Sequence, residues 1–165
     1  MCTLWYINGN VKKIIRSNAP VITKQISKDP TATIDTLLQD IYTDIKTGAA
    51  NQAIVDKAYI AISQAKILTT KDNPKTFISL GKTYEVAAVV GIQGAADLAL
   101  QSYEEFCKLE PNNPECYITI SKFLILDKNR KSEALVLAKM ALNLSRNQEE
   151  TKSINDLIIY IESLK

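Results

Sequence analysis

The stretch that decides the fold is Phe77-Ile78-Ser79-Leu80-Gly81-Lys82-Thr83-Tyr84. Its largest side chains recur at three- and four-residue steps, which is the spacing of one face of an α-helix. The small Gly81 lets a second helix approach closely, and Ala99 supplies a small residue on that helix. We expect Tyr103 to fill the space between the two helices and the turn at Pro111 to restart the chain. The pattern predicts a helical hairpin.

The same succession of residue types occurs on either side of this hairpin. The following copy contains Tyr117, Ile120, Ser121 and Leu124, then Ala134, Ala138 and Ala141. The preceding, more divergent copy contains Leu38 and Tyr42, then Ala58, Ile62 and Ala65. The equivalent positions Leu38, Leu80 and Ile120 are 42 and 40 residues apart. Periods in this range are typical of arrays in which each unit buries its apolar face against the next.

These residue types resemble the tetratricopeptide (TPR) family, with Phe77 in place of its tryptophan and Arg146 where the last copy should have proline. The TPR period is about 34 residues, so these repeats are elongated. Six additional residues lie between Tyr84 and Ala99, and we expect them to lengthen the first helix of the middle hairpin by about two turns. The resemblance implies an all-α, TPR-like array of about three hairpins in a right-handed superhelix.

The rest of the chain fits an all-α fold, because five glycines and five prolines in 165 residues leave room for long helices. Apolar periodicity predicts seven helices, over residues 33–46, 51–68, 74 to either 91 or 94, 98–109, 117–126, 132–144 and 151–164. We assign residues 1–30 to an N-terminal extension, 31–148 to the repeats (31–72, 73–113 and 114–148) and 149–165 to a capping helix. An array needs such a cap, because its last hairpin otherwise exposes an apolar face.

The composition argues against most catalytic chemistry. The chain contains no histidine, which removes the Ser-His-Asp and Cys-His mechanisms and histidine metal ligands. Paired acids such as Glu104-Glu105 are adjacent on a helix and so diverge, and the acidic residues lack EF-hand spacing. Gly91-Ile92-Gln93-Gly94 lacks the context of a phosphate loop. We therefore expect no enzyme activity, no catalytic residue, no cofactor and no metal.

The positive charge is concentrated at the N-terminus. Residues 1–28 hold five Lys or Arg and no Asp or Glu, whereas the net charge of the whole chain is only +2. This segment also contains Leu4-Trp5-Tyr6-Ile7. Two interpretations stay open: a surface extension that packs Trp5 and Tyr6 onto the first helices, or the exit of a membrane helix. Elsewhere only the short turn Lys128-Asn129-Arg130-Lys131 is basic, so we expect no nucleic-acid partner.

The three cysteines form no metal motif and no disulfide framework. Cys107 and Cys116 are nine residues apart across a Pro-containing turn. Two interpretations stay open for them. They are small buried apolar residues, or the turn brings them close enough to pair.

The TPR resemblance also implies a function, because TPR arrays hold peptides or partner domains in a groove lined by the first helix of each hairpin. Carried onto this sequence, the groove comprises Lys75, Ile78, Lys82, Glu85, Glu115, Ile118, Lys122 and Ile125. Lys82 and Lys122 occupy equivalent positions; they are either solvated or contact an acidic peptide. The carboxylate clamp that holds chaperone C-termini is not expected, since Ile78 and Ile118 replace its polar residues and Lys82 its asparagine.

The layout as a whole is loosely similar to the soluble TPR tail of bacterial membrane proteins that resemble O-antigen ligases. Two function classes therefore compete. The first is a protein–protein interaction module that binds an unidentified protein or peptide. The second is a regulatory or structural tail of a larger membrane protein, tethered through the N-terminus. The expected location is the cytoplasm or the soluble face of a membrane protein, and no stretch of this chain is expected to span the bilayer.

Overall fold

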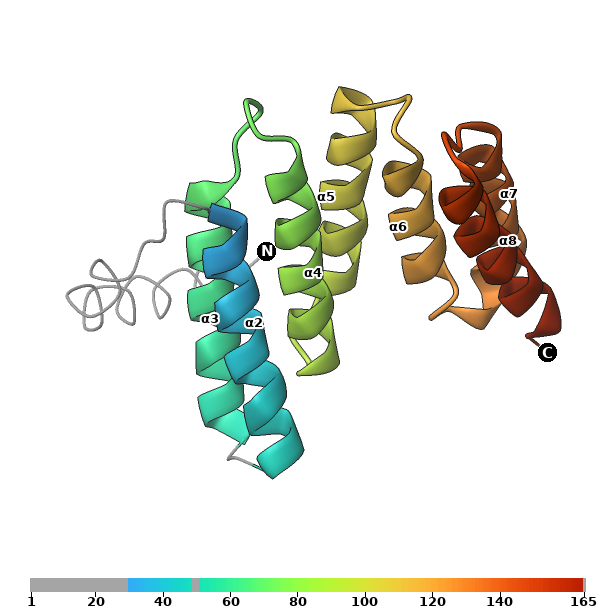
Figure 1. Ribbon diagram of the computed structural model, residues 1–165. Helices are drawn as coiled ribbons and strands as arrows, with labels where there is room; N and C mark the ends of the chain where they lie inside the picture. Colours follow the sequence, from blue (N-terminus) through green and yellow to red (C-terminus); the bar gives the residue numbers. More distant parts are fainter. Residues whose placement is uncertain (1–29, 49–50, 165) are drawn as a thin grey trace, which may run out of the picture.

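The computed structural model describes residues 30–48 and 51–164, so residues 1–29 of the predicted N-terminal extension, with Trp5 and Tyr6, lie outside it. The described chain is helical (Figure 1). Its elements are α2 (Pro30–Thr47), α3 (Asn51–Leu68), α4 (Lys75–Val89), α5 (Ala95–Leu109), α6 (Pro114–Leu124), the 3-10 helix η2 (Lys128–Arg130), α7 (Lys131–Asn143) and α8 (Gln148–Ser163). Seven α-helices thus occupy this part of the chain, as the periodicity predicts, and it contains no β-strand.

The helices pack as consecutive antiparallel pairs. Helix α2 lies against α3, α4 against α5, and α6 against α7, with α8 on the outer side of α7 (Figure 1). Contacts of α3 with α4 and of α5 with α6 join neighbouring pairs into one row. The three predicted hairpins and the terminal helix are therefore present in the predicted order.

The contact between Gly81 and Tyr103 holds the central hairpin together, as the sequence predicts. A Cβ added at Gly81 would lie 2.6 Å from both Cδ1 and Cζ of Tyr103, so only glycine leaves room for the ring. Tyr103 is 1% exposed and meets Phe123 of α6 edge-on, with ring centroids 5.9 Å apart. One aromatic side chain thus joins α4, α5 and α6.

The turn between α4 and α5 differs from the prediction. Helix α4 has 15 residues against 11 in α6, so it is about one turn longer rather than two. The other additional residues form the connection, in which Gly91 and Gly94 have φ values of 90° and 75°. This left-handed conformation favours glycine, and it lets the chain leave α4 and enter α5 within a few residues.

The core runs along the whole row and ends at α8. On that helix Ile154, Ile158 and Ile161 are buried, and Leu157 and Leu164 are half-buried. The Asn147 side chain caps its N-terminus by accepting a hydrogen bond of 2.9 Å from the Glu150 N–H. The face of α8 matches the prediction of a helix that covers the last hairpin.

A disulfide joins Cys107, near the end of α5, to Cys116 in α6, with Cα atoms 5.1 Å apart. Of the two interpretations left open by the sequence, pairing is therefore the one that the structure shows. Cys116 is also fully buried, so it contributes to the apolar core as well. The bond links the middle hairpin covalently to the third.

Candidate functional site

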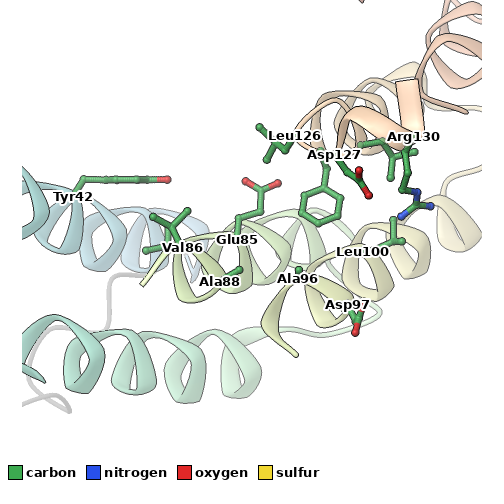
Figure 2. A pocket seen from close by; sticks show the side chains of 13 residues that line it. Tyr42, Glu85, Val86, Ala88, Ala96, Asp97, Leu100, Leu126, Asp127 and Arg130 are labelled. Atoms are coloured by element: carbon green, nitrogen blue, oxygen red, sulfur yellow. The ribbon is translucent and has the colours of Figure 1, made fainter. Parts of the chain in front are cut away.

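A hollow of about 460 Å³ lies where the C-terminal ends of α4 and α6 meet the N-terminal end of α5 (Figure 2). We call it the α4–α6 hollow. Its lining residues are Tyr42, Glu85, Val86, Ala88, Val89, Ala96, Asp97, Leu100, Phe123, Leu124, Leu126, Asp127 and Arg130. Residues from all three hairpins therefore contribute to one depression.

The rim of the hollow carries apolar side chains that no other part of the described chain covers. Val89 is 76% exposed, Leu126 75% and Tyr42 44%. Val89 also lines a second hollow, of about 400 Å³, beside Ile45 and Ile54. Large apolar side chains grouped around a depression are typical of a binding surface rather than of a solvated one.

Glu85 places a carboxylate among these apolar side chains. The Tyr103 hydroxyl donates a hydrogen bond of 2.8 Å to Glu85 Oε1. Partial burial raises the pKa of the Glu85 carboxyl, against the opposing effects of this hydrogen bond and of the Lys82 charge. Partial burial and the Glu85 charge in turn raise the pKa of Tyr42. In Figure 2 the Glu85 carboxylate stands between Tyr42 on one side and Leu126 and Asp127 on the other.

The remaining charges of the hollow are mostly negative. Asp97 lies in the first turn of α5, where the helix dipole favours an acid. Asp127 accepts a hydrogen bond of 2.9 Å from the Asn129 N–H. Arg130 is the cation among the lining residues, and its Nε and Nη2 donate to Glu133 at 2.9 and 2.8 Å. Arg130 also interacts electrostatically with Asp127, but three carboxylates against one guanidinium leave the lining acidic overall.

The structure distributes the eight predicted groove residues over different environments. Glu85 lines the hollow, whereas Ile78 is buried in the core at 6% exposure and offers little surface to a partner. Ile118 and Ile125 are half-buried. The exposed members of the set are Lys75, Lys82, Glu115 and Lys122. Apart from Glu85, none of the eight is among the residues that line the hollow.

The sequence reasoning missed Tyr42, Val89, Phe123 and Leu126 as site residues. A signal for three of them is present, because the runs Val86–Val90 and Phe123–Leu126 contain more consecutive apolar residues than one helix face can bury. Both runs lie at helix ends, where the chain turns away and no next turn covers the side chains. Periodicity alone assigns such residues to the core.

Two further features bear on chemistry. Within residues 30–48 and 51–164, no three His, Cys, Asp or Glu side chains come together as a group that could hold a metal ion. Among the same residues, no helix combines the length and apolarity needed to cross a bilayer.

No protein-family model matches the sequence, and no curated protein matches it. Solved structures do resemble the fold. One is the Yersinia enterocolitica type III secretion chaperone SycD in complex with a peptide of the translocator YopD, at 19% identity and a TM-score of 0.51; the match covers 79% of this chain and 93% of that chain. A structure of the type III secretion translocator chaperone SycD from the same organism matches at 20% identity and a TM-score of 0.51, over 86% of this chain and 89% of that one. At this identity the likeness shows the fold, which is an all-α, TPR-like array.

Proposed function

We propose that this chain is a non-catalytic peptide-binding module, and that the α4–α6 hollow holds a segment of a partner protein. The observation that carries the proposal is the placement of Val89 and Leu126, each about three-quarters exposed, on the rim of one depression. Exposed apolar side chains cost free energy in water, and a partner that covers them recovers it.

The structural neighbours support the same kind of function. One SycD structure contains a peptide, and that chain has the same arrangement of helices. The likeness by itself concerns the fold, so peptide binding by this chain is our proposal. The hollow is also of ordinary size for a site that takes a few side chains of a ligand.

The test is a selection of random 12-residue peptides, displayed on phage, against the full chain and two variants. Leu126→Ser removes an apolar side chain from the rim of the hollow without adding a charge, and it should strongly reduce enrichment. Ile67→Ser is the matched control, since Ile67 is 72% exposed on α3 and does not line the hollow. Equal enrichment on both variants, or none on the wild-type chain, would refute the proposed function.

The lysine face predicted from the sequence remains a second proposal for the same function. Lys82 and Lys122 are both exposed, so they are accessible to an acidic peptide. If this face binds, the double variant Lys82→Glu/Lys122→Glu should no longer enrich the peptides selected on the wild-type chain, while its helical content stays the same. Retention of every enriched peptide would remove that face from the binding site.

The alternative of a soluble tail of a larger membrane protein rests on residues 1–29, outside the described residues, and stays a prediction. The disulfide bears on location, because disulfides persist in oxidising compartments and are rare in the cytosol. It favours the soluble, outward face of a membrane over the cytoplasm. Thiol alkylation of the protein in its native cells, followed by mass spectrometry, would decide: alkylated Cys107 and Cys116 would indicate the cytoplasm.

A further inference from the structure

We infer that the segment held in the α4–α6 hollow is an apolar peptide that carries a Lys or Arg side chain. This inference rests on the proposed function and adds the chemistry of the partner. It predicts a basic peptide, whereas the lysine face predicts an acidic one, so one experiment separates the two proposals.

The balance of charge in the hollow is negative. Three carboxylates, those of Glu85, Asp97 and Asp127, line it together with one guanidinium. That guanidinium donates two hydrogen bonds to Glu133 and also interacts electrostatically with Asp127, so it offsets only part of the negative charge. A peptide that enters the hollow therefore meets a negative surface, which favours a cation and disfavours an acid.

Glu85 lies where a cationic group of a peptide could reach it. Its carboxylate is half-buried, and its Oε1 accepts a hydrogen bond from the Tyr103 hydroxyl. Within the described residues, none of the four ion pairs involves Glu85 or Asp97. The Lys82 charge acts on Glu85 without forming one of these ion pairs, so this carboxylate has lost part of its hydration among apolar side chains and has no cation in direct contact. An incoming ammonium or guanidinium group would supply that partner where water is excluded, and attraction between charges is strongest there.

Apolar and acidic groups alternate around the hollow. Figure 2 shows Glu85 in the middle of the labelled side chains, with Val86 beside it, Asp127 toward Arg130, and Asp97 below on α5 with its carboxylate directed away from Glu85. The apolar rim formed by Val89 and Leu126 belongs to the same depression. A Lys or Arg side chain can lay its methylene stem along this apolar surface while its charged end reaches Glu85. The occupant thus needs apolar residues next to the basic one.

The experiment compares peptide selections on the wild-type chain and on the double variant Glu85→Gln/Asp97→Asn. Glutamine keeps an oxygen that accepts the Tyr103 hydrogen bond, so the hollow retains its shape and loses only charge. On the wild type we expect enriched 12-residue peptides to contain Lys or Arg beside apolar residues. On the double variant we expect the basic preference to vanish and the apolar one to remain. A synthetic copy of the best peptide should bind that variant about tenfold more weakly, and Asp156→Asn, exposed on α8 and outside the hollow, should not change its affinity.

The outcomes are distinguishable. Enriched acidic peptides would overturn the inference in favour of Lys82 and Lys122, and enriched uncharged peptides would overturn it while leaving the proposed function intact. A basic preference that survives in the double variant would also overturn it. No enrichment on the wild type would refute the proposed function as well. If a second copy covers the hollow, light scattering would report a dimer that Leu126→Ser dissociates, and that result too would overturn the inference.

Discussion

The replacement Gly81→Ala should destabilise the protein, although the same change stabilises most helices. In a helix interior, alanine is favoured over glycine by about 1 kcal/mol. Here the new Cβ would lie 2.6 Å from two atoms of the Tyr103 ring, well inside van der Waals contact. The ring cannot move away freely, because its hydroxyl is bonded to Glu85 and its edge packs on Phe123.

The magnitude follows from these opposing effects. Overpacking a well-packed core costs about 1–3 kcal/mol, and a fully buried, doubly held ring puts this site near the upper value. After the gain of about 1 kcal/mol from helix propensity, the net loss is about 2 kcal/mol. For a chain of this size, such a loss lowers Tm by about 4–8 °C. Circular dichroism during thermal and urea unfolding measures both quantities.

A double-mutant cycle identifies the cause of the loss. In a Tyr103→Leu background the ring is absent, so Gly81→Ala should become neutral or stabilising, which gives a coupling energy of about 2 kcal/mol. Gly91→Ala is the control: its φ of 90° makes alanine strained, but nothing lies within 4 Å of the added Cβ. Its cost should not change in the Tyr103→Leu background. An increase in stability on Gly81→Ala in the wild-type chain would show that the Tyr103 ring leaves room for the added Cβ.

Three other predictions test separate parts of the structure. Truncation after Asn147 removes the three buried isoleucines of α8, so we expect aggregation or loss of near-UV circular dichroism; a soluble monomer with unchanged Tm would contradict the role of α8. Reduction of Cys107–Cys116, or serine at both positions, should lower the free energy of unfolding by about 2–3 kcal/mol in urea, as expected for a loop of this length; an unchanged urea midpoint would contradict it. Because the pKa of Glu85 is raised in the folded protein, its protonation favours folding at low pH, and this contribution is lost as the pH rises above about 4.5 through the folded-state pKa. The stability of Glu85→Gln relative to wild type should therefore increase with pH over that range, and a constant difference in urea midpoint would contradict it.

The fold could be predicted from the sequence because its determinants are local. Gly81, Ala99 and Tyr103 carry the packing of the central hairpin in their sizes alone, and Pro111 and Pro114 mark the restart of the chain. The predicted length of α4 was wrong, because the six additional residues could extend either the helix or the turn. In the structure, Gly91 and Gly94 have positive φ values, which end α4 and form the turn before α5.

The candidate site was much less predictable. A groove assigned by repeat position assumes that equivalent residues have equivalent surroundings, and Ile78 shows that they do not, because it is buried in the core. The hollow instead gathers the ends of helices from different hairpins, so its members share no sequence spacing. Glu85 was found because it lies on the first helix of its hairpin. Leu126 was missed because the sequence places it inside the helix predicted over residues 117–126, whereas α6 ends at Leu124 and leaves Leu126 in the following turn.

The central claim is that a peptide occupies the α4–α6 hollow. The most direct measurement places the photo-crosslinking residue p-benzoylphenylalanine at position 126 in one chain and at position 67 in another, and irradiates each with the best selected peptide. A peptide held in the hollow should form an adduct at position 126, reduced by Glu85→Gln/Asp97→Asn, and none at position 67. Equal adducts at both positions, or an adduct at position 67 alone, would contradict it.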